Sequence, residues 1–165
     1  MIFLSYLKEI KRNLLNKENF IYLIIIFIIF FFDRISKLKI INNFNENIYF
    51  VNDYINFDLI WNTGIGFGIL STESSFIYNL ISSLILLIII TLLTVFLNSK
   101  ISDKIIISVI AGGAVGNLYD RLIYKAVPDF IDLHYNNFHW FTFNVADIFI
   151  TVGIIGFLIN GSLKK

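Results

Sequence analysis

The sequence contains no cysteine, a single proline and few charged residues. Without cysteine, thiol nucleophiles, disulfide bonds and thiolate metal sites are excluded. Charged residues make up 15% of the chain and hydrophobic residues 57%, whereas a soluble domain has about 25% and 45–50%. The net charge of +1, with no basic cluster, gives no indication of a nucleic-acid partner. We therefore expect a protein whose solvent is the lipid bilayer.

Long apolar runs divide the chain into membrane-crossing segments. A helix needs about 20 mostly apolar residues to span a bilayer, and four stretches meet that requirement. We predict spans at about 17–39, 76–97, 105–124 and 144–161. No linker or internal repeat separates them, so residues 1–165 are expected to form a single integral-membrane domain.

The distribution of lysine and arginine predicts the orientation of these spans. Four spans place eight of the 13 basic residues on the side of both termini, which we expect to be cytoplasmic. The two long connections, 40–75 and 125–143, would then lie outside, and their alternating aromatic and β-branched residues predict short strands. The predicted fold class is an all-α membrane protein: four transmembrane helices with a small extracytoplasmic β-rich element resting on the membrane surface.

Polar side chains gather at one level, the outer ends of the predicted spans. A charge in hydrocarbon costs roughly 2.5–3.5 kcal/mol on insertion scales, so a common pocket would explain their presence there. Closely spaced glycines in the third span would let a neighbouring helix approach this pocket. The polar residues are Asp33 and Lys37, Asn62 where the first connection re-enters the membrane, Asn117, Asp120 and Arg121, Asp129 in the second connection, and Asn144 and Asp147; the glycines are Gly112, Gly113 and Gly116.

Each of these elements also has a simpler structural interpretation. Asn144 followed by Asp147 is typical of a helix N-cap with an acidic residue in the first turn. Asp120 and Arg121 are neighbours that would form an interfacial ion pair. The only two histidines lie five residues apart, at 134 and 139, in a loop without the HExxH spacing, which argues against a metal site. No single element establishes a function.

Five segments together resemble, in order and spacing, the motifs of the lipoprotein signal peptidases (signal peptidase II): "DRISK", "NTGIGFGIL", "GGAVGNLYDRL", "VPDFIDLH" and "FNVADIFI". The resemblance covers nearly the whole chain beyond about residue 20. It implies two catalytic aspartates, Asp129 and Asp147. The residues that it implies as substrate-binding or site-supporting are Asn62, Gly64, Gly113, Asn117, Arg121, Asn144, Ala146, Asp33 and Lys37.

This resemblance implies a membrane aspartyl endopeptidase of the bacterial cytoplasmic (inner) membrane, with its active site near the extracytoplasmic face. Its expected activity is removal of signal peptides from diacylglyceryl-modified prolipoproteins, with cleavage before the lipidated cysteine. Two carboxylates that share one proton can hydrolyse a peptide bond, so we expect neither a metal nor a cofactor. The expected partners are the lipid-modified signal peptide and membrane lipids, without nucleic acid, and we expect a monomer.

Two other classes of protein would also bury carboxylates. A presenilin-like intramembrane aspartyl protease uses two aspartates, but "LYD" at 118–120 has no GxGD partner and the chain is short. In a proton-coupled carrier the polar groups would form a path across the membrane, whereas here they lie at one outer level. A lipoprotein-cleavage assay separates the two enzyme hypotheses, and a liposome flux assay tests the carrier.

Overall fold

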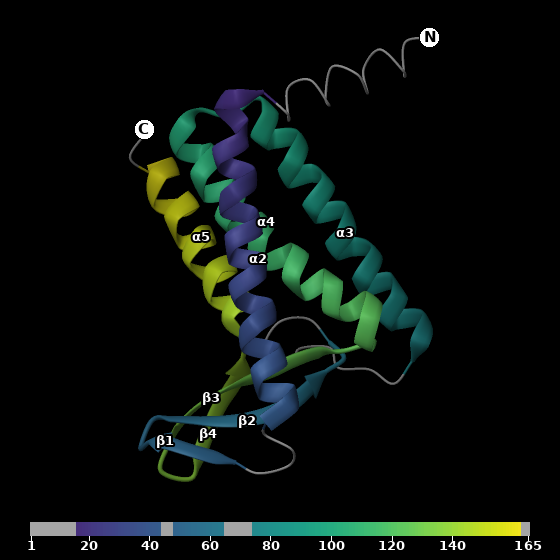
Figure 1. Cartoon of the computed structure of the whole chain (residues 1–165), viewed down its shortest axis with the longest axis vertical. Coiled ribbons are helices and arrows are strands. Elements are labelled where there is room, and N and C mark those ends of the chain that lie inside the picture. The colour runs from purple at the N-terminus through teal and green to yellow at the C-terminus, as the bar shows by residue number, and fades with distance from the viewer. Residues whose placement is uncertain (1–15, 44–47, 65–73, 163–165) are drawn as a thin grey trace.

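The computed structural model describes residues 16–43, 48–64 and 74–162 as four helices and four strands. The helices run side by side and the strands form a sheet at one end of them (Figure 1). α2 begins and α5 ends at the other end of the helices. In chain order the elements are α2 (Lys17–Asn43), β1 (Tyr49–Asn52), β2 (Ile55–Asn62), α3 (Ser75–Leu97), α4 (Ile101–Tyr124), β3 (Val127–Tyr135), β4 (Phe138–Phe143) and α5 (Val145–Ser162).

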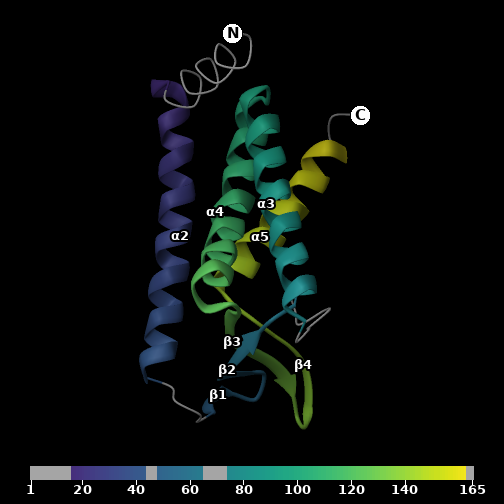
Figure 2. The same cartoon turned by 90° about the vertical axis from the view of Figure 1, so that its right-hand side faces the viewer.

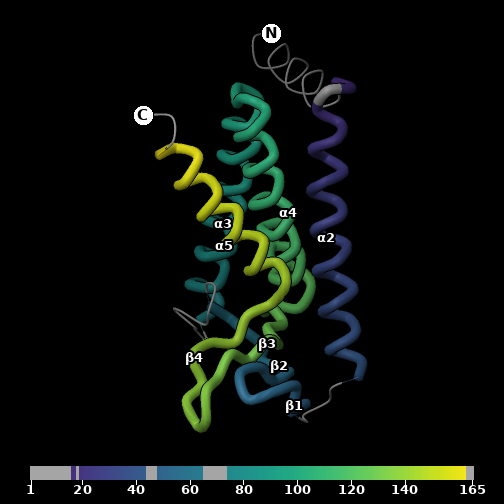
Figure 3. The backbone as a smooth tube through the Cα atoms, turned by 90° about the vertical axis from the view of Figure 1, so that its left-hand side faces the viewer, coloured from purple at the N-terminus to yellow at the C-terminus, as the bar shows by residue number. Residues whose placement is uncertain are grey.

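The helices have the lengths and surfaces of membrane spans. Within the described residues, α3, α4 and α5 are long and apolar enough to cross a bilayer. α2 has 27 residues and runs alongside them in both side views (Figures 2 and 3). It exposes apolar side chains such as Phe27 and Phe32, and exposed apolar surface of this kind indicates contact with lipid or a partner. The predicted four-helix membrane fold is confirmed, although the third helix begins at Ile101 rather than near residue 105.

α4 is the central helix and packs against α2, α3 and α5. Its glycines set the spacing of these helices. A Cβ atom at Gly112 would lie 2.9 Å from an isoleucine of α2, and one at Gly113 would lie 2.5 Å from the Ala146 carbonyl oxygen of α5. A Cβ atom at Gly116 would lie 2.5 Å from Asp33 Oδ2. No side chain fits at such distances, so the close helix packing predicted from the glycine spacing is confirmed.

The strands form one antiparallel sheet in the order β1-β2-β3-β4. The pairing of β2 with β3 puts Asn62 opposite Val127, at the start of β3. β4 leads through the single residue Asn144 into α5. The strands predicted in both connections are confirmed, and the second connection is mostly a hairpin. The sheet therefore brings the end of β2, the start of β3 and the start of α5 to one place.

Candidate active site

Asn144 joins the two aspartates. It is fully buried between β4 and α5. Its side-chain Nδ2 donates to Asp129 Oδ1 at 2.6 Å, and its Oδ1 accepts the backbone N–H of Asp147 at 3.0 Å. The backbone N–H of Asn144 donates to Asp147 Oδ2 at 3.2 Å. The reciprocal bonds between Asn144 and Asp147 form a capping box, so the helix-cap interpretation is correct. The same asparagine also holds Asp129, which a cap alone does not require.

Asp129 lies on β3, not in a loop, and is buried. Its Oδ2 accepts a hydrogen bond from Asn62 Nδ2 at 2.8 Å. Burial raises the pKa of the Asp129 carboxyl to about 7, and the negative charge of Asp147 adds to this rise. Hydrogen bonds from Asn62 and Asn144 act in the opposite direction on that pKa. The carboxyl can therefore hold a proton near neutral pH.

Asp147 lies in the first turn of α5. Its Oδ1 accepts a hydrogen bond from Asn117 Nδ2 at 2.8 Å. The orientation of this amide is fixed, because Asn117 Oδ1 accepts a hydrogen bond from Lys37 Nζ at 2.9 Å. The unpaired backbone N–H groups at a helix N-terminus favour a negative charge there. Asp147 therefore occupies a position suited to an ionised carboxylate.

A buried ion network supports this end of the helices. Lys37 is fully buried, and besides Asn117 it donates to Asp33 Oδ2 and to Asp120 Oδ2, both at 2.7 Å. Asp33 Oδ1 accepts the backbone N–H of Ala146 at 3.0 Å, one of the N–H groups at the start of α5 that its own helix leaves unpaired. Burying these charges is tolerated because each finds a partner. The network thereby attaches α2 to α4 and α5.

The suggested ion pair between Asp120 and Arg121 is wrong, because consecutive helix residues do not face each other. Asp120 instead pairs with Arg34, a residue that the sequence did not identify as part of the site. Arg121 donates to the carbonyl oxygen of Gly64 at 2.7 Å and to that of Asn117 at 3.1 Å. Arg34 follows Asp33 directly in the chain, but only the helix packing shows that it reaches α4.

Two apolar clefts open beside Asp147. One, of about 400 Å³, lies between α3, α4 and α5 and is lined mainly by aliphatic side chains; its polar residues are Asn117, Arg121, Asp147 and Thr151. The other, of about 280 Å³, lies between the β3–β4 hairpin and α5 and includes Leu133 and Phe143. Because Asp147 lines both, an apolar group in either cleft lies next to a carboxylate.

The supporting residues predicted from the sequence all lie in or beside this cluster, with different tasks. Gly113 and Ala146 provide close contact between α4 and α5. Gly64 contributes its backbone: its N–H donates to Asn62 Oδ1 at 2.8 Å and its carbonyl accepts from Arg121. The two histidines lie on β3 and β4 rather than in a loop, outside the cluster around Asn144.

Comparisons with known proteins agree on one family. The family model described as "Signal peptidase (SPase) II" matches residues 25–163. The lipoprotein signal peptidase of Pelagibacter ubique (strain HTCC1062) is 49% identical over 147 residues, which cover 86% of this chain and 88% of that protein. The lipoprotein signal peptidase of Anaplasma phagocytophilum (strain HZ) is 38% identical over 145 residues, covering 86% and 92%.

The fold is also similar to solved structures. A bacterial membrane enzyme determined by the in meso method at 2.3 Å resolution matches with a TM-score of 0.74 and 28% identity, over 87% of each chain. A second such enzyme, at 1.9 Å resolution, matches with a TM-score of 0.70 and 27% identity, over 84% of this chain and 90% of that one. The chain belongs to the signal peptidase II family, the aspartic-type membrane peptidases that remove signal peptides from prolipoproteins.

Proposed function

We propose that Asp129 and Asp147 are the catalytic pair, and that the enzyme cleaves diacylglyceryl-modified prolipoproteins directly before the lipidated cysteine. The observation that carries this proposal is the bridge through Asn144, which holds both buried carboxylates beside two apolar clefts. Both aspartates belong to one chain, so the site needs no second copy and a monomer suffices.

The two carboxylates have different environments, and this difference assigns their roles. We assign the proton to Asp129, whose pKa is raised to about 7, and the role of the base to Asp147, which accepts hydrogen bonds from Asn117 and from the backbone N–H of Asn144. Asp147 removes a proton from a water molecule as the water oxygen bonds to the scissile carbonyl carbon. Asp129 donates its proton to the carbonyl oxygen, which gives a tetrahedral diol. Asp147 then returns its proton to the amide nitrogen while Asp129 takes a proton back from one hydroxyl of the diol. The carbon–nitrogen bond breaks, the products are a carboxylic acid and a free amine, and both aspartates regain their starting states.

The two clefts fit the two apolar parts of the substrate. The signal peptide lies on one side of the scissile bond and the lipidated cysteine on the other. A signal peptide in the cleft between α3, α4 and α5 and acyl chains in the cleft beside the β3–β4 hairpin would meet at Asp147, which lines both. The bond that joins them would then lie next to the carboxylates, and such positioning lowers the entropic part of the barrier.

Arg121 is suited to hold the substrate backbone. It lines the larger cleft, and its Nε is buried without a hydrogen-bond partner among residues 16–43, 48–64 and 74–162. A buried donor without a partner costs stability, and a carbonyl oxygen of the bound peptide would satisfy it. Its other nitrogens donate to carbonyl oxygens of Gly64 and Asn117, which fixes the guanidinium.

We also propose that both termini are cytoplasmic and that the active site lies near the extracytoplasmic face. The start of α2 and the end of α5 lie at the end of the helices away from the sheet (Figure 1). Eight of the 13 basic residues fall on the side of the termini, as expected for the cytoplasmic side.

The test uses purified protein in detergent with a diacylglyceryl-modified prolipoprotein. Mass spectrometry should show one new N-terminus, at the lipidated cysteine. No proposed step passes through a metal, so cleavage should persist with a chelator. Cleavage at another bond, or no cleavage by a folded protein, would contradict the proposal.

A further inference from the structure

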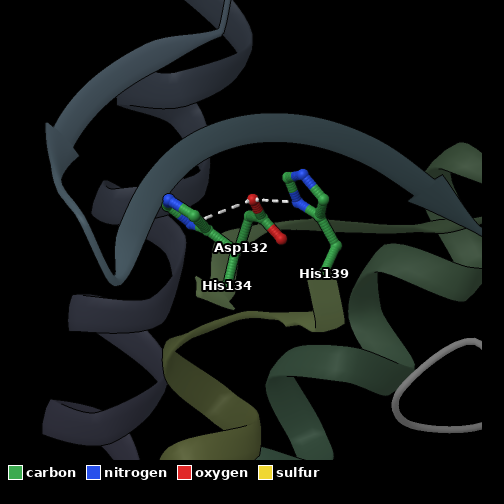
Figure 4. A group of neighbouring side chains, drawn as sticks. All are labelled: Asp132, His134 and His139. Carbon is green, nitrogen blue, oxygen red and sulfur yellow. Dashed lines mark hydrogen bonds and ion pairs between the residues drawn. The ribbon is translucent and has the colours of Figure 1, made fainter. Parts of the chain in front are cut away.

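We propose that Asp132, His134 and His139 form a binding site for one divalent transition-metal ion, best suited to zinc, on the β3–β4 hairpin. The potential ligand atoms of these three residues all lie within 4.8 Å of one another. Figure 4 shows the Asp132 carboxylate between the two imidazole rings. The site is separate from the polar cluster around Asn144, and the inference does not depend on the catalytic roles proposed above.

The distances within the cluster are close to those of a metal site. Asp132 Oδ2 lies 2.8 Å from His139 Nδ1 and 3.5 Å from His134 Nδ1. Around a tetrahedral zinc ion with ligands at 2.0–2.2 Å, neighbouring ligand atoms are roughly 3.4 Å apart. With all ligand atoms within 4.8 Å of one another, rotation of these side chains would place one ion between the carboxylate and the two imidazoles.

Two buried polar atoms at the cluster make no hydrogen bond within residues 16–43, 48–64 and 74–162. The side chain of His134 is only 8% exposed, and its Nδ1 makes no hydrogen bond within residues 16–43, 48–64 and 74–162. Asn56 Oδ1 is likewise buried without a partner in those residues. Asn56 pairs directly with Asp132 across β2 and β3, so the two side chains share a face of the sheet. Unsatisfied buried groups require an explanation, and a bound metal ion is one.

An ion with a bound water would satisfy both of these atoms. His134 Nδ1 would bind the metal. A water in the fourth coordination position would donate a hydrogen bond to Asn56 Oδ1. Two imidazoles, one carboxylate and an open position form a common zinc ligand set, whereas magnesium and calcium prefer oxygen ligands alone.

The hairpin explains how residues without a metal-binding spacing come together. Asp132 and His134 are two residues apart on β3 and so point to the same face. The chain turns through Asn136, which has a φ of 51°, and β4 returns with His139 opposite His134. The HExxH spacing, whose absence argued against a metal site, belongs to a helix, whereas on a hairpin the register between strands brings the ligands together.

An ion can reach this site from solvent. A polar surface cleft of about 610 Å³ borders His134 and contains the carboxylate of Asp53, which would attract a cation. The side chain of His139 is 55% exposed. A bound ion would fasten β4 to β3, the strand that also carries Asp129. The expected effect of the ion is therefore a more stable hairpin.

The test measures zinc binding directly, on the full chain in detergent, without a polyhistidine tag and after treatment with a chelator. Calorimetry should show one zinc ion per chain, and zinc should raise the midpoint of thermal unfolding. Because the chain has only two histidines, ¹⁵N-histidine NMR reports on this cluster alone and should show both rings shifted by zinc.

His139→Ala should weaken zinc binding tenfold or more and remove the thermal shift, and its exposed position makes misfolding a minor concern. Phe138→Ala is the matched control on the same strand, since Phe138 is exposed and offers no ligand; it should bind zinc like the wild type. Equal affinity in His139→Ala and wild type would overturn the proposal. So would an absence of zinc binding by the wild type, which would leave only a hydrogen bond between Asp132 and His139.

Discussion

Lys37 is linked to Asp147 through a single amide: Lys37 Nζ donates to Asn117 Oδ1 at 2.9 Å, and Asn117 Nδ2 donates to Asp147 Oδ1 at 2.8 Å. The lysine does not touch Asp147, yet it decides which atom of Asn117 faces the carboxylate. The ion network that joins α2 to α4 therefore also positions Asp147, one of the two proposed catalytic residues, and we expect stability and activity to be coupled at Lys37.

The first prediction is that Lys37→Met both destabilises the enzyme and slows cleavage. Asp33 and Asp120 would be left buried without their shared cation, and breaking a buried pair costs about 3–5 kcal/mol. Thermal unfolding and kcat should both fall, while KM should change little because Lys37 lies outside the clefts. Lys39→Met is the matched control, since Lys39 is exposed on the same helix. If the kcat of Lys37→Met equals that of Lys39→Met, stability and activity are not coupled at Lys37. The double variant Lys37→Met/Asp33→Asn should be more stable than Lys37→Met alone, because it removes one of the two carboxylates left without the lysine.

The second prediction concerns the proposed catalytic pair. Asp129→Asn and Asp147→Asn should each reduce cleavage by about a thousandfold or more, as expected when one member of a catalytic unit is removed. Both variants should still accumulate in the membrane. Asp58→Asn on β2 is the control and should remain active. If Asp147→Asn kept near-normal turnover, Asp147 would serve only as part of the helix cap.

The third prediction is a basic limb in the pH profile near pH 7. The pKa of Asp129 is raised to about 7, so the carboxyl is protonated below that pH and loses its proton as the pH rises through it. In the proposed mechanism the protonated form donates to the scissile carbonyl, so kcat/KM should fall as the pH increases above about 7. Rates measured on one lipidated precursor across the pH range test this. An undiminished kcat/KM well above pH 8 would remove Asp129 as the acid.

The sequence predicted the four-helix fold, because long apolar runs are local features. The motif residues that it singled out come together in one polar cluster, and their catalytic and supporting roles remain a proposal. The sequence did not predict side-chain partners between elements. The pairing of Asp120 with Arg34 depends on how α2 and α4 are rotated against each other, which local patterns in the sequence do not reveal. The pairing of His134 with His139 depends on a register shift between Leu133 and His134.

The fourth prediction is topological. Reporters fused after Lys165, or inserted within 98–104, should be cytoplasmic, and reporters inserted within 42–53 should be external. The reason is the excess of lysine and arginine on the side of the termini. Paired alkaline phosphatase and fluorescent-protein fusions measure both locations. A cytoplasmic signal from reporters within 42–53 would contradict this topology and would place the active site on the cytoplasmic side of the membrane.

The fifth prediction is that the enzyme prefers the lipidated precursor and that the cleft beside the hairpin carries this preference. Each buried methylene contributes about 0.8 kcal/mol, so losing contact with about two methylenes should slow cleavage roughly tenfold. Val152 lines this cleft and is exposed, so Val152→Trp should fill it with little effect on folding. We expect Val152→Trp to slow cleavage of the diacylglyceryl precursor about tenfold and to leave the slower cleavage of the unmodified precursor unchanged.

Leu158→Trp is the matched control for this variant, because Leu158 is equally exposed on α5 and lines neither cleft. It should cleave both precursors like the wild type. The comparison separates two possibilities. If Val152→Trp slows both precursors equally, the cleft holds the peptide rather than the acyl chains. If the wild type cleaves both precursors at the same rate, the lipid is not recognised, and the enzyme acts as a general aspartyl protease within the membrane.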